Sequence, residues 1–301
     1  VILTGFNIDL KEGVKTLAPL MDKANAPQIV VMSEEPLWDI TWSGPFTGRN
    51  GLVTAEGVEI PYHFFGHETS DIYDFDKLPY FILSNVDYAV RYSALMSRFK
   101  NMTAKSLLER WERAPIRSAF FAEKRKGDNY GKIFADRDVA GLSSYRTEIA
   151  ELSTGDDVLR VGKGWGAEVR RQDLPDWHLD KLAQLDGQVR VATAYENVHQ
   201  YAYISEKIFD SFAVGGIPTY WASPKHRVFD LVSGEAMLNT RDLDAAEAAA
   251  KIATFNPDLA MAEAWLASCT QLAALFSDIN AVQAERQRVA NAALKEILSV
   301  V

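Results

Sequence analysis

The chain has 301 residues, of which 48% are hydrophobic and 24% are charged, a composition typical of a soluble globular protein large enough for two domains. Its net charge of −9 argues against nonspecific nucleic-acid binding, because neutralising phosphates requires a basic surface. The single cysteine, Cys269, excludes an intramolecular disulfide and a multi-cysteine metal site, and it fits a reducing compartment. The apolar residues around Cys269 predict that its side chain is buried. No stretch approaches the roughly 20 consecutive apolar residues of a membrane helix.

The first part of the chain is predicted to form an α/β series. In chain order the pattern predicts a strand at 1–4, a helix at 10–23, a buried strand at 28–32, a hairpin with strands at 51–54 and 58–62, a further strand at 79–90 and a helix at 104–113. Pro115 breaks the last helix, so we place a domain boundary near residues 105–116. The chain begins directly with a strand and no signal peptide, so we expect an N-terminal piece to be missing.

A second α/β series follows the boundary. The pattern predicts strands at 119–122, 158–161, 189–194 and 217–221, helices at 143–152 and 204–214, and a helical tail at 242–301. The expected helix caps are Ser143, Ser144, Ser205, Asp242 and Asn256. Two such series indicate two Rossmann-like domains facing a cleft, with a helical C-terminal tail. This is the glycosyltransferase B architecture, although periodicity alone also allows a dehydrogenase.

The strand–helix–strand unit in the second series brings polar side chains to one loop and one helix start. Ligands of such sheets bind beyond the carboxyl ends of the strands, where 189–194 leads toward the helix at 204–214. Lys207 lies in the first helical turn, where unpaired amides and the helix dipole favour an anion, so a diphosphate site without a metal is predicted. The Glu206 carboxylate could accept hydrogen bonds from the two hydroxyls of a ribose. It is equally consistent with the local sequence that Lys207 is a solvated surface lysine and that Glu206 only complements the helix dipole.

Two weaker candidates lie between the domain boundary and this unit. Arg146, one turn into the helix at 143–152, would add a bidentate grip on phosphate, although a surface arginine fits its local sequence better. Gly162 and Gly164 follow a strand without matching the G-x-G-x-x-G pattern. They indicate a tight turn at the cleft and give little support to a dinucleotide-dependent enzyme.

Glu34 and Glu35 end a buried strand in the first series, again at the edge where ligands bind. If the strand continued, the two side chains would point in opposite directions, and one would face the cleft as a general base with a pKa raised by desolvation. A solvated strand end is the plain alternative. The five histidines show no convincing metal-ligand spacing, and no Ser/His/Asp hydrolase pattern is present.

The run from Tyr195 to Pro224 resembles the α-1,3/1,4-fucosyltransferase family (glycosyltransferase family ten), especially its bacterial members. The matching segments are Tyr195-Glu196-Asn197, Tyr203-Ile204-Ser205-Glu206-Lys207 and Ile217-Pro218-Thr219-Tyr220-Trp221. Ser205 replaces the usual threonine and keeps the capping hydroxyl. Two further matches follow the family's chain order: Glu34 aligns with its proposed general base, and Arg146 aligns with the arginine that holds the donor pyrophosphate.

The resemblance implies an inverting transfer of L-fucose from GDP-β-L-fucose to a glycan hydroxyl, in a bacterium a lipopolysaccharide or other surface saccharide. It divides the chain into an acceptor-side domain, 1–112, without the family's first strand–helix unit, and a GDP-sugar domain, 113–301. Residues 40–115 match poorly, so the acceptor is not identified. The expected location is cytoplasmic, and peripheral association with the inner membrane face is left open.

The resemblance also assigns roles to residues. Lys207 and Arg146 would stabilise the departing GDP without a metal or another cofactor, and Glu34 or Glu35 would be the general base. The remaining substrate-binding candidates are Tyr195, Glu196, Asn197, Tyr203, Glu206, Gly162 and Gly164, with Glu35 if Glu34 is the base. The alternatives are the same fold with another nucleotide sugar, such as GDP-mannose, and an NAD-dependent oxidoreductase.

Overall fold

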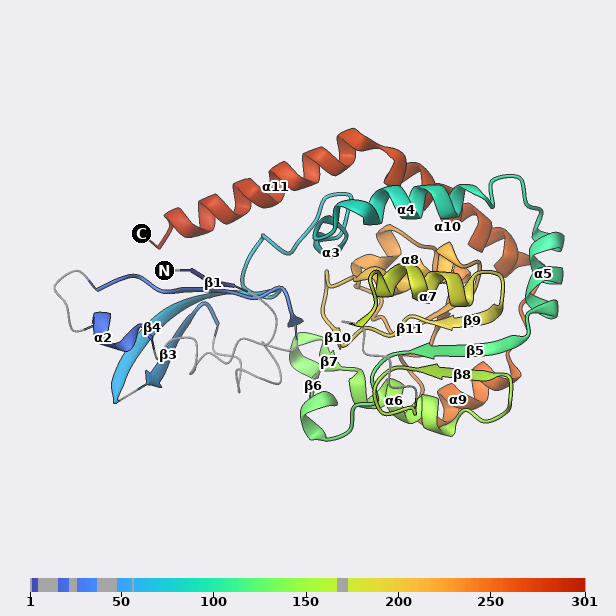
Figure 1. Cartoon of the computed structure of the whole chain (residues 1–301), viewed down its shortest axis with the longest axis horizontal. Coiled ribbons are helices and arrows are strands. Elements are labelled where there is room, and N and C mark those ends of the chain that lie inside the picture. Colours follow the sequence, from blue (N-terminus) through green and yellow to red (C-terminus); the bar gives the residue numbers. More distant parts are fainter. Residues whose placement is uncertain are drawn as a thin grey trace.

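A four-stranded sheet and a five-stranded sheet form the two ends of the molecule, with a small three-stranded sheet between them (Figure 1). The structure is a computed structural model, and it describes residues 2–4, 16–21, 26–36, 48–55, 57–166 and 173–300. The chain is thus mixed α/β with a parallel sheet and a helical C-terminal region, as the sequence predicted.

The four-stranded sheet contains β1 (Ile2–Thr4), β2 (Val30–Met32), β3 (Asn50–Ala55) and β4 (Val58–Phe65), in the order β1-β2-β4-β3. β1, β2 and β4 are parallel, and β3 pairs antiparallel with β4 as the predicted hairpin. Only α2 (Ala18–Met21) represents the predicted helix at 10–23 among the described residues, and the rest of that prediction lies outside them.

The five-stranded sheet is parallel throughout, in the order β12-β11-β9-β5-β8. Its strands are β5 (Ile116–Phe121), β8 (Val158–Val161), β9 (Val189–Thr193), β11 (Ile217–Tyr220) and β12 (Leu238–Asn239). β9, α8 (Glu206–Ala213) and β11 form the predicted strand–helix–strand unit. The small antiparallel sheet consists of β6 (Ile133–Phe134), β7 (Val139–Gly141) and β10 (Val198–His199).

Helices cover this sheet on both sides. Figure 1 shows α4 (Val86–Ser97), α8 and α10 (Leu259–Ser277) above it, and α6 (Ser143–Leu152) and α9 (Ala245–Thr254) below. The other helices are α3 (Tyr80–Leu83), α5 (Ala104–Arg113), α7 (Trp177–Leu185) and α11 (Ile279–Leu298). Short 3-10 helices lie at Asp128–Tyr130, Ala135–Arg137, Arg227–Asp230 and Gly234–Ala236.

The predicted strand at 79–90 is wrong, because this segment forms α3 and the start of α4. Asn85, which interrupts the apolar pattern, is the N-cap of α4 and accepts a hydrogen bond from the Asp87 amide. The apolar residues Tyr88, Tyr92 and Met96 are four apart and lie buried on one side of the helix. A short apolar run fits a strand or a buried helix equally well, and here the cap decides.

The core that surrounds the five-stranded sheet extends across the predicted domain boundary. Tyr92 of α4 and Trp111 of α5 belong to the same buried cluster as Phe209 of α8 and Trp265 of α10. The Trp111 indole donates to the Gly215 carbonyl oxygen, which closes the end of α8. The division at residue 112 remains a prediction, and this packing favours an earlier division.

The caps of the C-terminal helices lie two residues later than predicted, because Asp244 and Asp258 cap α9 and α10 in place of Asp242 and Asn256. α10 is long and apolar enough to cross a membrane by length and composition, with a mean hydropathy of 1.3, and one third of that segment is buried. Cys269 on α10 is buried as predicted, and burial raises the pKa of its thiol to about 12.

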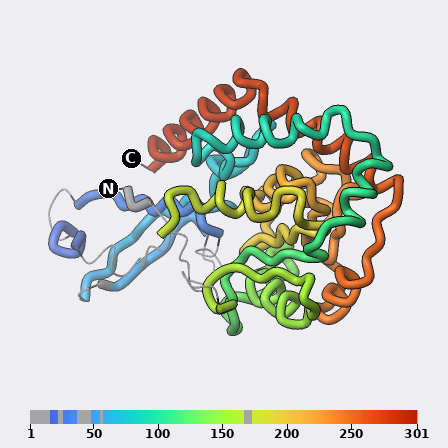
Figure 2. The backbone as a smooth tube through the Cα atoms, turned by 45° about the vertical axis from the view of Figure 1, so that its right-hand side comes forward, coloured from blue at the N-terminus to red at the C-terminus, as the bar shows by residue number. Residues whose placement is uncertain are grey.

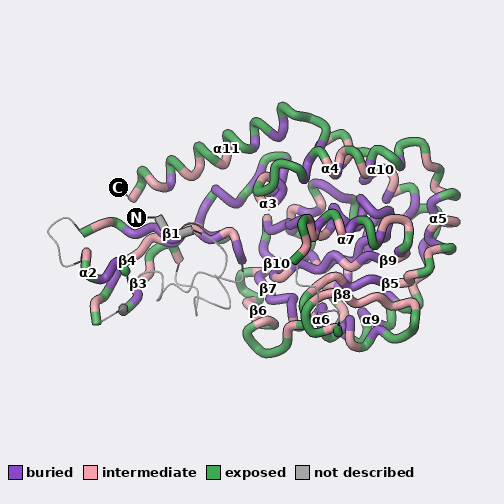
Figure 3. The backbone as a smooth tube through the Cα atoms, viewed as in Figure 1, coloured by how far each residue is buried: buried purple, intermediate pink, exposed green. Residues whose placement is uncertain are grey.

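α11 runs back along the outside of the molecule to the four-stranded sheet, so both termini lie near that sheet (Figure 2). Its apolar side, with Val289 and Ile297, packs against Val30 and Phe65. Glu296 forms an ion pair with Arg49 there. Figure 3 shows the outer side of α11 exposed along much of its length, whereas β11 is buried throughout and the edge strand β8 is intermediate. The last helix therefore ties the end of the chain to its first strands.

Candidate functional site

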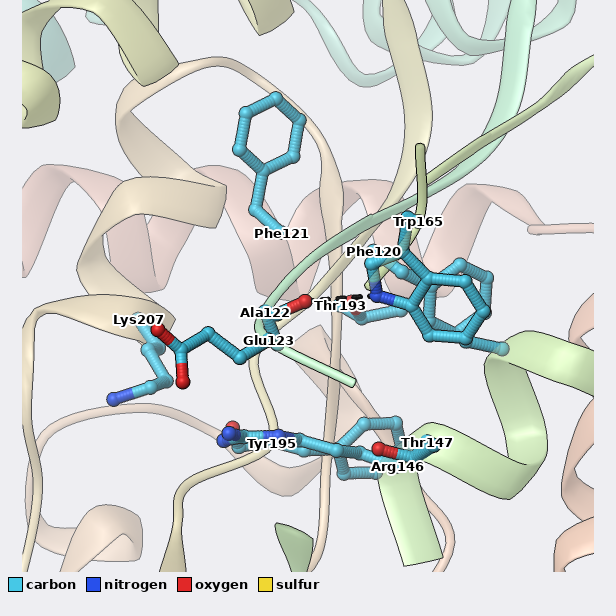
Figure 4. Close-up of a pocket in the computed structure, with 11 residues that line it drawn as sticks. Phe120, Phe121, Ala122, Glu123, Arg146, Thr147, Trp165, Thr193, Tyr195 and Lys207 are labelled. Atoms are coloured by element: carbon cyan, nitrogen blue, oxygen red, sulfur yellow. Dashed lines mark hydrogen bonds between the residues drawn. The ribbon is translucent and has the colours of Figure 1, made fainter. Parts of the chain in front are cut away.

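A pocket at the carboxyl edge of the five-stranded sheet combines side chains from several separate segments. Figure 4 shows two cations, Lys207 and Arg146, extending to the same side of the pocket as the carboxylate of Glu123. Tyr195 and Trp165 also line it. β5 and β9 both end here, which is where open parallel sheets bind ligands. The structure thus brings together the two cations that the sequence singled out.

Lys207, in the first turn of α8, is held by carboxylates. Its Nζ lies 3.0 Å from a Glu196 oxygen and 3.6 Å from a Glu206 oxygen, and it donates to the Ser205 hydroxyl at 2.7 Å. Burial by itself lowers the pKa of Lys207, but the two carboxylates outweigh it, so the pKa is raised. Lys207 therefore stays charged in the pocket at neutral pH.

Arg146 on α6 supplies the second cation. It is 5% exposed, and its Nη1 donates to the Tyr195 carbonyl oxygen at 3.3 Å. Its charge also lowers the pKa of Lys207, so the two cations repel each other across the pocket. An anion placed between them would relieve this repulsion and gain from both charges.

None of the three predicted serine caps forms in the expected way, although both helices are found: Ser144, for example, lies inside α6 and its hydroxyl donates to the Gly127 carbonyl oxygen. Ser143 is the first residue of α6, and its hydroxyl donates to the Asn197 carbonyl oxygen. Ser205 occupies the N-cap position of α8, but its hydroxyl donates to Glu196 at 2.6 Å. Glu196 also accepts the Ser205 amide at 2.8 Å. The loop before α8 is thus fixed through Glu196.

Glu196 and Asn197 connect parts of the protein in the structure. The buried Glu196 accepts three hydrogen bonds, from the Ser205 amide, the Ser205 hydroxyl and Lys207, so it orients Lys207. The carbonyl oxygen of Asn197 accepts a hydrogen bond from the Leu142 amide and thereby joins the loop between β9 and α8 to the start of α6. Their direct contact with substrate remains a prediction.

Tyr195 and Glu206 lie beside the two cations. The Tyr195 ring lines the pocket, and its hydroxyl is 3.0 Å from the Thr240 hydroxyl. Glu206 is 3% exposed and pairs with Lys207, so it neutralises part of that charge. The ribose role of Glu206 remains a prediction.

The glycine turn after β8 forms the wall opposite α8. Gly162 and Gly164 have φ values of 135° and 91°, which other residues rarely adopt. A Cβ atom on Gly162 would lie 2.6 Å from the Ala122 carbonyl oxygen, so the turn also needs glycine for close approach to β5. The turn places Trp165 in the pocket, where its indole donates to that same oxygen at 2.9 Å. The predicted tight turn is confirmed.

Glu34 and Glu35 are not among the described residues that line this pocket. β2 ends at Met32, so the condition under which the two side chains would alternate along a strand does not hold. The Glu34 carboxyl is hydrogen bonded to Tyr80, and burial raises its pKa. Glu35 is buried. The pKa of Tyr203, in the loop before α8, is raised mainly by burial and further by the negative charge of Glu35.

A buried polar network behind α8 was not predicted. Asp210, one turn after Lys207, accepts from Lys181 at 2.7 Å, from His178 at 2.6 Å and from Tyr92 at 2.6 Å. Arg91 donates to Nδ1 of His178, so the His178 hydrogen is on Nε2 and points at Asp210. Despite burial, these partners lower the pKa of Asp210 to about 2. The network fixes α8 to α7 and α4.

Sequence reasoning also missed Glu123 and Trp165. Glu123 follows the predicted strand at 119–122, and its place at a carboxyl strand end was the available signal. Trp165 stood inside the glycine turn without being assigned a role. Among the described residues, no group of three or more His, Cys, Asp or Glu side chains is arranged to hold a metal ion.

Fold and pocket define an α/β protein with a cationic pocket at the carboxyl edge of a parallel sheet. No protein-family model and no curated protein matches the chain. Among solved structures, the chain is similar to an α1,3-fucosyltransferase with GDP-fucose, at 15% identity and a TM-score of 0.34. The match covers 94% of this chain and 80% of that chain. This likeness is too loose to carry an argument about activity.

Proposed function

We propose that the protein is an inverting glycosyltransferase that moves L-fucose from GDP-β-L-fucose to a hydroxyl of a glycan. The observation that carries the proposal is the pairing of Lys207 and Arg146 in one pocket at the carboxyl edge of the sheet. A buried arginine and a partly buried lysine from different helices suit a diphosphate, which carries charge at more than one oxygen. The motif from Tyr195 to Pro224 supports a GDP-fucose donor through its resemblance to fucosyltransferases.

In the proposed reaction, Lys207 and Arg146 stabilise the leaving GDP. The bond between the anomeric carbon and the phosphate oxygen breaks, and negative charge grows on the diphosphate. Fixed cations stabilise such charge without reorganisation, and removing one such group costs roughly 2.7–4 kcal/mol of barrier in comparable sites. These two side chains supply the positive charge that a divalent metal supplies elsewhere, so the reaction as proposed needs no metal.

The proposed general base is Glu34, with Glu35 as the alternative. Glu34 takes the proton of the acceptor hydroxyl, whose oxygen attacks the anomeric carbon opposite the leaving phosphate, so the configuration inverts. Burial raises the pKa of Glu34, which brings its basicity closer to working pH. Because Glu34 and Lys207 come from different halves of the chain, we infer that the halves approach each other when the donor binds.

Calorimetric titration with GDP-fucose, GDP-mannose, a UDP-sugar and NADH tests the donor class. We expect binding of the GDP-sugars, weakened by Arg146→Ala and unchanged in Arg113→Ala, whose side chain is exposed and forms a pair with Glu109. A further incubation with GDP-fucose and a glycan panel identifies the acceptor. Tight binding of only the uridine donor, or only of NADH, would rule out this function.

A further inference from the structure

A row of aromatic rings connects the loop before α8 with the region around Glu34. The Tyr203 ring meets His67 edge-on, with centroids 5.0 Å apart. His67 lies against Tyr73 at 4.6 Å, and Tyr73 meets Tyr80 at 4.9 Å. Tyr73 and Tyr203 are each 3% exposed. The row of rings is therefore continuous from the loop that precedes Lys207 to α3.

One member of this row holds the backbone of Glu34. Nε2 of His67 lies 3.0 Å from the Glu34 carbonyl oxygen. Since a carbonyl only accepts, Nε2 carries the hydrogen and His67 donates it. Burial lowers the pKa of His67 to about 4, although its bond to Glu34 opposes this, so the ring is neutral at ordinary pH. At neutral pH, Nε2 of the neutral ring therefore donates this bond.

A second member holds the carboxyl group. The hydroxyl of Tyr80 is hydrogen bonded to the Glu34 side chain. Burial and, to a smaller extent, the negative charge of Glu34 raise the pKa of Tyr80. The Tyr80 hydroxyl therefore stays protonated and donates to Glu34. In the part of the chain that the structure describes, the titratable groups around Glu34 are Tyr80 on α3, His67 after β4 and Glu35 next in the chain. Of these, only Tyr80 is placed as a donor to the carboxylate.

We propose that Tyr80 and His67 are positioning residues for Glu34: Tyr80 directs its carboxylate, and His67 fixes its backbone and connects it to Tyr203. This inference rests on the proposed transferase function. A general base must lie within hydrogen-bond reach of the proton that it takes, and small displacements cost large factors in rate. Tyr203 lies in the loop four residues before Lys207, so the row of rings connects that loop with the residues around Glu34.

Tyr80→Phe keeps the ring and removes only the hydroxyl. Losing a donor to the carboxylate raises the Glu34 pKa, so the acid limb of kcat/KM moves to higher pH, and we expect kcat to fall about tenfold. The Kd for GDP-fucose should not change. The matched control is Tyr62→Phe in β4, a tyrosine whose raised pKa comes from burial alone, and it should leave the limb in place. A merely structural ring would move the melting temperature and not the limb.

His67→Phe keeps an aromatic ring and removes the donor to Glu34. We expect kcat to fall about tenfold with an unchanged acid limb and an unchanged Kd for GDP-fucose. The inference is wrong if the wild type is active and Tyr80→Phe leaves the acid limb of kcat/KM at its wild-type pH. It is also wrong if the wild type is active and His67→Phe leaves kcat unchanged. In either case the proposed function stands. If the folded wild type forms no product from any GDP-sugar, the proposed function fails and the inference fails with it.

Discussion

Substituting Asp210 tests the network that fixes α8 and its lysine. A fall of the Asp210 pKa from its ordinary 3.8 to about 2 corresponds to roughly 2.5 kcal/mol of folding stability at neutral pH. Asp210→Asn removes this contribution and leaves Lys181, which is 6% exposed, without its counter-charge. Breaking one partner out of a buried ion pair costs about 3–5 kcal/mol, so the loss should fall in that range.

Urea unfolding at a series of pH values measures the effect. Because the Asp210 pKa is lower in the folded state, its ionised form stabilises the fold at pH values above the unfolded-state pKa. This stabilisation is lost as the pH falls through the folded-state pKa. The difference between wild type and Asp210→Asn should therefore be largest above pH 4 and shrink toward pH 2. The control Asp186→Asn weakens partly exposed ion pairs with Arg98 and Arg110 and should cost about 1 kcal/mol or less. A loss below about 1 kcal/mol for Asp210→Asn, or one independent of pH, would refute the reasoning.

Three further predictions concern the site. Lys207→Ala should lower kcat/KM by about 10²–10³-fold, and a folded variant with unchanged kcat/KM would exclude Lys207 from leaving-group stabilisation. Because the pKa of Glu34 is raised above its ordinary 4.5, the acid limb of the wild-type kcat/KM profile should lie above pH 4.5. Glu34→Gln should abolish transfer. If this variant transfers fucose at the wild-type rate, Glu34 is not the general base. Glu123→Gln removes a negative charge beside the cations and should tighten GDP binding a few-fold at low salt, a gain that 1 M salt suppresses; weaker binding would show that Glu123 contacts the ligand favourably.

The sequence was most informative where the pattern repeats over a full element. The strand–helix–strand unit at 189–221 follows from β-branched strands, a helical apolar stripe and Gly215 at the helix end, and each of these signals is local. The segment 79–90 failed because its apolar run is too short to distinguish strand from helix. The cap at Asn85 carried the missing information, and it was treated as an interruption.

The arrangement of the site depends on contacts that no local pattern contains. Asp210 occurs in the apolar stretch of α8, but its partners Lys181 and Tyr92 are 29 and 118 residues away. Likewise, Ser205 marked the start of α8, yet its hydroxyl bonds to Glu196 in a loop nine residues earlier. The identity of the cations was therefore predictable, whereas what holds them was not.

The anomeric configuration of the first product tests the central claim most directly. GDP-β-L-fucose is incubated with the folded protein and an acceptor glycan, and proton NMR follows the anomeric signal before any equilibration. The account predicts an α-L-fucoside, formed at a rate that depends on Lys207 and Arg146. A β-L-fucoside, or a product formed equally fast by the Arg146→Ala variant, would contradict it.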